Sequence, residues 1–370
     1  MEDGYSIFLS NRKQQVMING TKSNVTHVTS GVPQGTVLGP ILFLIYVSDI
    51  GENIDAIKKI YVDDTKVKKG IKSEEDVESL QADLNKLYDW AKTNNMVFNG
   101  TKFQVVRYGY NDDLKEETLY FTEDTSEIIE RFETLRDLGV ILSEEATFSA
   151  HVQHVEKKVR QKIGWVLRTF YTRNAGFMKT LYKTLIVPHV DYCSQLWMPI
   201  QSTQILSIEK LQKDFLNRIP AVREMNYWEQ LKHLKMISLQ RRLERYRVLY
   251  IWKILEGISP NCGISVKFEG GRLGRMCKIP ILNTHAKASV KTMREQTFQV
   301  NGPKLFTSLP AKIRNMTKCS LEDFKMALDS YLAKVPDEPS VSGLTPGGCT
   351  PEARASNSLL DQAKRTNLAG

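Results

Sequence analysis

The run KKIYVDDTKVKK, residues 58–69, alternates apolar and polar residues on both sides of an acidic pair, Asp63 and Asp64. A period of two residues is typical of β-strands, so the run predicts a β-hairpin with the two aspartates at its tip. Within a strand the adjacent carboxylates would point to opposite faces, whereas at a turn both can face water. The pair is therefore either an acidic surface turn or part of a metal site.

Turn and helix signals surround this hairpin. Asn19-Gly20, between two β-like runs in residues 13–31, predicts an earlier hairpin. The segment GVPQGTVLGPILFLIYV, residues 31–47, predicts a turn followed by a helix that is apolar on nearly all sides and hence buried. Residues 73–95 have the period of an amphipathic helix, and short strands are expected between residues 103 and 142. The first part of the chain is thus predicted to be α+β.

The pattern changes near residue 147. Residues 147–258 are basic and helical in period, which predicts a separate helical domain. A small mixed region is expected over residues 259–335, with a strand in TFQVNGPKLF and short helices after it. From residue 336 to 370 the chain is rich in Pro, Gly and Ser and lacks apolar periodicity, so we expect a disordered tail.

Charge is distributed unevenly along the chain. The net charge is +9, yet residues 1–150 carry an excess of nine acidic side chains, and residues 151–260 and 261–370 carry excesses of eleven and seven basic ones. A basic second part predicts binding to a polyanion, with a solvated basic helical surface as the alternative.

Cysteine usage and hydropathy exclude several classes. The 5 cysteines are scattered and include no CxxC pair, which argues against a disulfide framework and against a zinc ribbon. The longest apolar run is too short to cross a bilayer, and the N-terminus has no apolar signal region. We expect a protein that is not secreted or membrane-bound, located in the cytoplasm, the nucleus or both.

The order of the motifs is more specific than any one of them. SGVPQGTVLGPILFLIYVSDI is followed by YVDD, a helix, FNGTKFQVVRYG and LRDLGVIL. This order resembles the palm of reverse transcriptases of non-LTR (LINE-like, jockey-like) retrotransposons. The helical part, with LYKTLIVPHVDYCSQLW and NYWEQLKHLKMISLQRRLERY, resembles the region that follows the palm. The resemblance covers about residues 5–335 and implies a partial palm over residues 1–146 and a thumb-like domain over residues 147–258.

The resemblance implies roles for individual residues. Asp63 and Asp64 would bind Mg²⁺ or Mn²⁺, since two-metal nucleotidyl transfer needs hard oxygen ligands. Lys102 would lie near the pyrophosphate, with an ordinary surface lysine as the alternative. The residues expected to contact template, nucleotide or primer are Pro33, Gln34, Gly35 and Tyr61. LRDLGVIL resembles the hairpin that supports the primer end. The implied partners are an RNA template, a DNA primer and dNTPs; the oligomeric state stays open.

Rows of basic side chains predict contacts with nucleic-acid phosphates. One row lies in the first helix of the helical domain and another in its last helix, and phosphate contacts from them would be independent of sequence and sensitive to salt. The residues are Lys157, Lys158, Arg160, Lys162 and Arg168, then Arg241, Arg242, Arg245 and Arg247. His151 and His154, three residues apart, have metal-binding spacing but no Cys or carboxylate beside them, so a metal site there is disfavoured.

The metal site is expected to be incomplete in this chain. The family resemblance implies a further aspartate on a strand well upstream of VPQG, and the only acids before VPQG are Glu2 and Asp3. Two functions are therefore considered. The first is a retrotransposon-derived RNA-directed DNA polymerase fragment that is inactive alone. The second is a non-catalytic, nucleic-acid-binding remnant of a retrotransposon.

Overall fold

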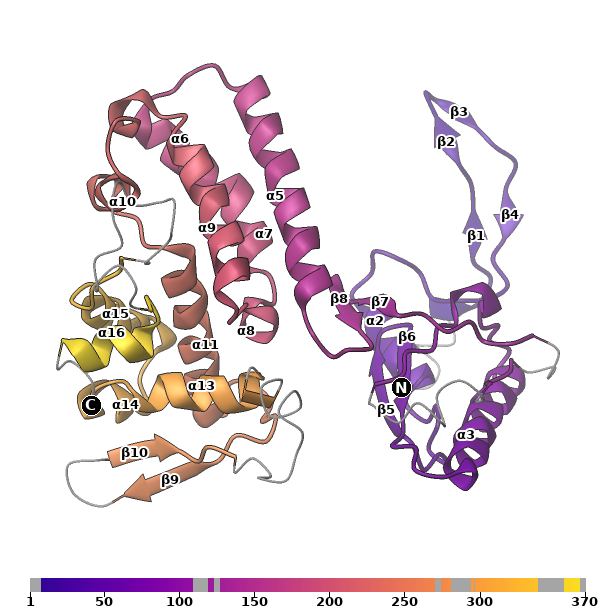
Figure 1. Ribbon diagram of the computed structural model, residues 1–370. Coiled ribbons are helices and arrows are strands. Elements are labelled where there is room, and N and C mark those ends of the chain that lie inside the picture. Colours follow the sequence, from indigo (N-terminus) through magenta and orange to yellow (C-terminus); the bar gives the residue numbers. More distant parts are fainter. Residues whose placement is uncertain are drawn as a thin grey trace. The chain divides into compact units, whose positions relative to one another are not determined.

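A computed structural model of the chain describes residues 8–108, 119–122, 127–269, 274–280, 294–295, 297–338 and 356–366 (Figure 1). It divides into two compact units, Met1–Phe132 and Glu133–Gly370. Helices are combined with two-stranded antiparallel sheets, which confirms the predicted α+β class. The domain boundaries predicted at residues 146/147 and 258/259 both fall inside the second unit, because the segments on either side of each are packed together.

In its described residues, the first unit is built mainly from short hairpins and the α-helices α2 and α3. Its elements in chain order are β1 (Lys13–Gln14), β2 (Met17–Ile18), β3 (Thr21–Lys22), β4 (Thr26–His27), α2 (Leu38–Tyr46), β5 (Ile57–Tyr61), β6 (Asp64–Lys68), α3 (Glu74–Thr93) and the 3-10 turn η1 (Gly100–Lys102).

The first predicted hairpin is present as a two-tiered arm. β2 pairs with β3 across Asn19 and Gly20, both of which have positive φ, and β1 pairs with β4 further down. Asn-Gly suits this turn because both positions require left-handed backbone. All four strands are exposed, and the arm projects from the rest of its unit (Figure 1).

The helix after VPQG departs from its predicted burial. Helix α2 contributes Phe43 to the core of its unit, next to Val47 at the helix C-terminus. On another face, Ile41, Leu44 and Ile45 are 50%, 56% and 64% exposed. Hydropathy predicts that an apolar face needs cover, but it does not say which element covers it. Within the described residues only one side of α2 is covered.

The other predicted strands of the first unit are reduced to single bridges. Val105 pairs with Arg131, and Phe121 pairs with Ile128, without a continuous ladder among the described residues. The core of this unit instead forms where α3 meets the β5–β6 hairpin and α2, with Val47, Ile50 and Leu87 buried at its centre.

The second unit begins with a hairpin and continues as a helical bundle. Its elements are β7 (Thr134–Asp137), β8 (Val140–Ser143), α5 (Ser149–Thr169), α6 (Ala175–Leu181), the π-helical turn η2 (Tyr182–Ile186), α7 (Val187–Asp191), α8 (Ser194–Trp197), α9 (Ser202–Leu216), η3 (Pro220–Val222), α10 (Tyr227–Leu234), α11 (Leu239–Leu255), β9 (Val266–Glu269), β10 (Gly274–Cys277), α13 (Phe298–Thr307), α14 (Ala311–Arg314), α15 (Leu321–Leu332) and α16 (Leu359–Arg365).

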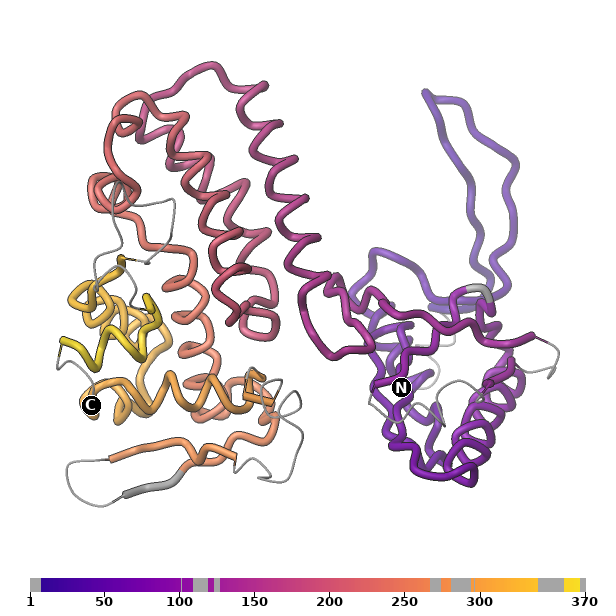
Figure 2. The backbone as a smooth tube through the Cα atoms, viewed as in Figure 1, coloured from indigo at the N-terminus to yellow at the C-terminus, as the bar shows by residue number. Residues whose placement is uncertain are grey.

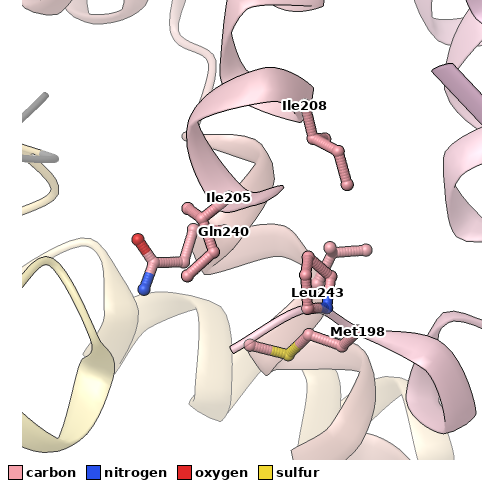
Figure 3. A pocket seen from close by; sticks show the side chains of 6 residues that line it. Met198, Ile205, Ile208, Gln240 and Leu243 are labelled. Carbon is pink, nitrogen blue, oxygen red and sulfur yellow. The ribbon is translucent and has the colours of Figure 1, made fainter. Parts of the chain in front are cut away.

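Helices α5 to α10 enclose one apolar core of this unit, and α11 passes from it into a second. The first core includes Val159, Trp197 and Phe215, and the second includes Trp252 and Phe324, whose rings stack with centroids 4.6 Å apart. A cavity of about 10 Å³ lies in the bundle beside Met198, Ile208 and Leu243 (Figure 3). This space holds no more than about one water molecule.

The segment TFQVNGPKLF is helical, not a strand as its sequence predicts. Residues Phe298–Thr307 form α13, with Pro303 inside the helix. A Cβ at Gly302 would lie 3.0 Å from Ile251 Cδ1, so the packing of α13 leaves little room for a side chain at this position. The local strand signals are overridden by packing of α13 against α11. The short helix predicted after it is present as α15.

The predicted disordered tail is also corrected over part of its length. Residues 336–338 and 356–366 are described, and α16 lies beside the other helices of its unit (Figure 2). Leu359 is fully buried in the second core, and Asn357 is 3% exposed. Composition alone misses this docking because the few apolar residues that matter are separated by a long polar segment. The rest of the predicted tail lies outside the described residues.

Among the described residues, no helix has both the length and the hydropathy required to cross a membrane.

Candidate metal-binding hairpin and nucleic-acid surface

The acidic pair lies at the tip of the β5–β6 hairpin, as predicted. Tyr61 pairs with Asp64, so Val62 and Asp63 form a two-residue turn. Asp63, Asp64 and Tyr61 are all exposed, Tyr61 at 61%. Val62 has φ of 58°, a left-handed backbone that β-branched residues rarely adopt. The tight turn holds the two carboxylates at the end of an anchored ladder, where both reach solvent.

A buried carboxylate anchors the base of this hairpin. Asp83, on α3, is 1% exposed and accepts hydrogen bonds from the backbone N–H groups of Ala56, at 2.9 Å, and Asp55, at 3.2 Å. Lys86 contributes an ion pair at 3.2 Å. Burial alone would raise the pKa of Asp83, but these donors outweigh it and lower the pKa below its usual range. The start of β5 is therefore tied to α3 by a charge-assisted contact.

The VPQG turn depends on two glycines. Gly35 has φ of 75°, and Gly39 lies so close to the turn that a Cβ would be 2.7 Å from the carbonyl oxygen of Pro33. Thr36 closes the turn, because its hydroxyl donates to Pro33 O at 2.8 Å and accepts from the N–H of Gly39 at 3.1 Å. Gln34 is exposed on this turn, with its amide free to meet a ligand.

Lys102 ends the short η1 turn, which is closed by its own N–H donating to Asn99 O at 3.0 Å. Its side chain is exposed. Within the described residues no contact links Lys102 to Asp63 or Asp64.

The basic row of α5 occupies one side of that helix. Val152, Val155, Val159 and Val166 face the core, each less than 5% exposed. The opposite side carries the exposed Lys157, Lys158, Arg160 and Arg168, together with the half-buried Lys162. Lys162 Nζ lies 4.8 Å from the ring centroid of Trp165, which is 43% exposed. Cations interleaved with an exposed aromatic ring form a surface suited to phosphates and bases. This surface is called the α5 basic face.

The arginines of α11 do not form the predicted second row. Arg241 is 1% exposed, and its Nη2 donates to the carbonyl oxygens of Pro336 and Asn357, both at 3.1 Å. Its Nε lies 3.4 Å from Glu244. Arg247 is fully buried, and burial lowers its pKa to about 10. Buried guanidinium groups cannot reach a phosphate in solvent, which contradicts the contacts predicted for Arg241 and Arg247.

Arg242 and Arg245 are less buried, but each is paired. Arg242 donates from Nε and Nη2 to the two carboxylate oxygens of Asp191, at 2.7 and 2.6 Å. Arg245 Nη2 donates to Asp329 at 2.8 Å. All four arginines of this stretch are thus either buried or held by carboxylates, so the row in the sequence is not a row of cations open to solvent. We assign them to packing of α11.

Two residues that sequence reasoning did not single out support the site. In the sequence, Asp83 belongs to an amphipathic helix and Gly39 to an apolar segment. An acidic residue on the apolar side of a helix indicates a buried carboxylate that is held by donors, since charged residues are rarely buried unless they are paired. No pattern in the sequence indicated that Gly39 contacts the VPQG turn.

The donors around the acidic pair are limited. Within the part of the chain that the structure describes, no group of three or more His, Cys, Asp or Glu side chains is arranged to hold a metal ion. Asp63 and Asp64 are therefore two hard oxygen donors on one turn, without a third carboxylate from the described residues. Such a pair fits Mg²⁺, which takes one or two carboxylates and fills its other positions with water and phosphate oxygens.

Comparison with known proteins agrees with the motif order. The family model of reverse transcriptase (RNA-dependent DNA polymerase) matches residues 5–162. The RNA-directed DNA polymerase from mobile element jockey of Drosophila melanogaster is 26% identical over 267 residues, which cover 69% of this chain and 28% of that protein. No solved structure matches the chain significantly.

A second relative gives the same result. The probable RNA-directed DNA polymerase from transposon X-element of Drosophila melanogaster is 27% identical over 217 residues, 55% of this chain and 23% of that protein. The chain thus spans about a quarter of the length of these curated relatives. The resemblance predicted from the motifs is confirmed: residues 5–162 match the reverse transcriptase family, and the chain is similar to the RNA-directed DNA polymerases of the mobile elements jockey and X-element.

Proposed function

We propose that the chain is the part of a retrotransposon RNA-directed DNA polymerase that carries the metal-bearing hairpin of the palm, in the first unit, and a thumb-like nucleic-acid-binding bundle, in the second. The observation that carries the proposal is the position of Asp63 and Asp64 at an exposed two-residue turn inside the region matched by the reverse transcriptase family. The partners are an RNA template, a DNA primer and dNTPs, and the location is the cytoplasm or the nucleus.

Asp63 and Asp64 would hold Mg²⁺ through their carboxylate oxygens. The bound ion would polarise phosphate oxygens and favour the ionised form of an attacking hydroxyl. The hairpin keeps the two carboxylates in place because its ladder runs from Tyr61–Asp64 to Ile57–Lys68 and its base is fixed by Asp83. A ligand that moves by an ångström loses much of its effect, so this anchoring is part of the function.

Other residues of the first unit would position substrates. Gln34, on the glycine-stabilised turn, would present its amide to a base or sugar, and Gly35 lets the backbone approach without a Cβ. Tyr61, exposed beside the acidic pair, would contact the primer end. Lys102 would stabilise negative charge on the leaving pyrophosphate. Each of these roles requires an exposed side chain, and Gln34, Tyr61 and Lys102 are exposed.

The α5 basic face would bind the sugar-phosphate backbone of a primer–template duplex. Lys157, Lys158, Arg160 and Arg168 are exposed on it, and Trp165 provides a surface for stacking. A fluorescent primer–template is titrated with the full chain across a salt series, followed by anisotropy. The slope of log K against log salt should fall by about 0.9 for each phosphate contact removed, so by about two in the Lys157→Gln/Arg160→Gln variant.

The control for this experiment is Lys210→Gln on α9, which removes one exposed charge away from the α5 basic face. Its salt slope should match that of the unchanged chain. Absence of binding at low salt would refute the proposal, and equal slopes in all three proteins would move the binding surface away from α5.

We further propose that this chain alone does not extend a primer. Two carboxylates from one turn supply too few protein ligands for a two-metal site, and the described residues add no third. The same observation favours the second candidate function, a non-catalytic nucleic-acid-binding remnant. Primer extension is assayed with dNTPs and Mg²⁺ or Mn²⁺. Robust extension that disappears in Asp63→Asn would overturn this proposal and would show that the chain is an active polymerase.

A further inference from the structure

A cleft of about 460 Å³ lies in the second unit between the β7–β8 turn, helix α5 and helix α7. Its lining brings together Arg136, Lys158 and three histidines, His151, His154 and His189. Leu138, Gly139, Val155, Pro188 and Tyr192 form the rest of the walls. The Tyr192 hydroxyl donates to Leu138 O at 2.7 Å. Among the described residues the lining contains cations and imidazoles and no carboxylate, which is the composition of an anion site.

His151 adds an observation that does not depend on charge. It is 2% exposed, and its Nδ1 accepts a hydrogen bond of 3.2 Å from the backbone N–H of Ile141. The proton of the neutral ring is therefore on Nε2. Among the described residues this buried Nε2 has no hydrogen-bond partner. An unsatisfied buried donor costs about 1–3 kcal/mol, so an acceptor supplied by the occupant of the cleft would stabilise this arrangement.

Three histidines also suggest a metal, but their geometry does not support one. No group of three or more His, Cys, Asp or Glu side chains within the described ranges is arranged to hold a metal ion. Nδ1 of His151 is already an acceptor for Ile141, and a guanidinium and an ammonium in the same cleft would repel a cation. The lining therefore selects an anion that accepts several hydrogen bonds at once.

We propose that this cleft binds a phosphate group of a nucleic-acid strand, held by Arg136, Lys158 and the His151 N–H, and that its binding is accompanied by proton uptake at His154 and His189. The choice of nucleic acid as the source of the phosphate rests on the proposed function, because Lys158 belongs both to the cleft and to the α5 basic face. Arginine and lysine are the usual phosphate donors, and a phosphodiester offers two anionic oxygens to such a set.

The proton uptake follows from the charges around the imidazoles. The pKa of His154 is lowered by burial and then by Arg136, Lys158 and Lys157, and the pKa of His189 is lowered by burial and then by Lys158 and Lys162. Burial, followed by His154 and Arg136, lowers the pKa of His151 to about 4, so this ring stays a neutral donor. Two carboxylates lie on the same elements: Asp137, on β7, takes part in an interaction, and Asp191, on α7, is paired with Arg242.

A bound phosphate reverses this electrostatic effect. Its negative charge favours the protonated imidazoles, so the pKa values of His154 and His189 rise on binding. Affinity must then increase as the pH falls through the range of these pKa values, by at most about tenfold per pH unit for each proton taken up.

The first test uses inorganic pyrophosphate as a probe of the cleft, titrated into the full chain by calorimetry at constant pH. Arg136→Gln removes a charge-assisted donor from the cleft and should weaken binding about tenfold. His154→Gln should weaken it by a smaller factor. Arg136 and His154 lie on the rim with exposed and half-buried side chains, so neither variant disturbs the core. Lys210→Gln is the matched control and should bind as the unchanged chain does.

The second test measures proton uptake with oligothymidylate, whose phosphodiesters and bases do not titrate between about pH 6 and pH 8. The imidazole signals of the 6 histidines are followed by NMR with and without the oligonucleotide. The signals lost in His154→Gln and His189→Gln should titrate at higher pH in the complex. Unchanged histidine pKa values on binding, or pyrophosphate affinities equal in Arg136→Gln and the control, would overturn the inference.

The outcomes separate this inference from the proposed function. If the chain binds duplex in a salt-dependent way but the cleft variants change nothing, the cleft is not a phosphate site and the proposed function stands. If pyrophosphate binds and is lost in Arg136→Gln, yet no nucleic acid binds, the anion site is supported and nucleic acid is excluded as its source.

Discussion

The carboxylate of Asp83, on helix α3, accepts a 2.9 Å hydrogen bond from the backbone N–H of Ala56, the residue that precedes strand β5. The other carboxylate oxygen receives the N–H of Asp55 at 3.2 Å. Through these two bonds the first long helix determines where the strand leading to Asp63 begins. The hairpin tip is thus positioned by a residue twenty positions further along the chain that never reaches the solvent.

Replacing Asp83 with Ala should destabilise the first unit by about 1–3 kcal/mol, because two backbone donors lose their acceptor. Amide exchange should accelerate in β5 more than in the β1–β4 arm. Since the pKa of Asp83 is lowered in the folded chain, its contribution is present above its unfolded value of 3.8 and is lost as the pH falls through the folded pKa. Asp89→Ala, exposed on the same helix, should leave β5 unaffected.

Gly39→Ala should open the turn that carries Gln34. The added Cβ would lie 2.7 Å from the carbonyl oxygen of Pro33, a contact that the backbone must move to relieve. Alanine gains about 1 kcal/mol in helix propensity, whereas overpacking against backbone costs about 1–3 kcal/mol. Thermal unfolding should therefore show a net loss of stability. Gly70→Ala, with open space around its Cα, is the matched control, and an equal response of both variants would contradict the steric explanation.

Glu209→Gln should flatten the pH dependence of unfolding. Glu209 is fully buried, with acceptor contacts to the Tyr227 hydroxyl and the Gln240 N–H, and burial raises its pKa from 4.5 to about 7. The folded state then binds the extra proton, so stability falls as the pH rises from about 5 to about 8, by up to roughly 3 kcal/mol.

Denaturant unfolding at several pH values measures this effect. Exposed Glu145→Gln should retain the full pH dependence. Burial also raises the pKa of Glu244 to about 7. The free energy of unfolding of Glu209→Gln should therefore still depend on pH, but less steeply than that of the unchanged chain. A slope in Glu209→Gln that equals the slope of the unchanged chain would show that Glu209 is ionised in the folded state.

Leu359→Ala should destabilise the second unit by about 2–5 kcal/mol, the usual cost of truncating a fully buried leucine. Detachment of α16 would also remove the N–H that Leu359 donates to Glu244 at 3.0 Å. Limited proteolysis should then cleave the chain after residue 338 faster than before. Lys364→Ala, on the exposed side of the same helix, should behave as the unchanged chain. A stable Leu359→Ala protein with unchanged protease resistance would show that α16 does not contribute to the core.

The features that the sequence predicts correctly are local ones. The Asn19-Gly20 turn and the alternation around Asp63 and Asp64 each define a hairpin within a few residues, and the apolar period of α5 defines both the helix and its buried side. These signals need no information about distant segments. Each motif is likewise local, and the order of the motifs carries the resemblance to reverse transcriptases, whose family model matches residues 5–162.

The features that sequence reasoning misses depend on segments far apart in the chain. Arg241 is basic and helical in sequence, but its burial is determined by the carbonyl oxygens of Pro336 and Asn357. Phe298–Thr307 has strand-like residues, yet packing against α11 makes it a helix. The histidines of the cleft are another case, since His189 and His151 come from different helices and meet Arg136 from a hairpin. In none of these cases does a regular spacing in the sequence predict that the segments meet.

The docking of α16 has a consequence for how the second unit is assembled. Glu244 and Leu359 are 115 residues apart. The chain between them must therefore fold back on α11 before Leu359 can take its place in the second apolar core. Contacts of such long sequence separation cost loop-closure entropy and form late. We therefore expect the bundle of α5 to α10 to form early from local contacts, and the burial of Arg241 and Glu244 to be completed later. Until α16 docks, the side of α11 that carries these two residues is expected to stay in contact with water.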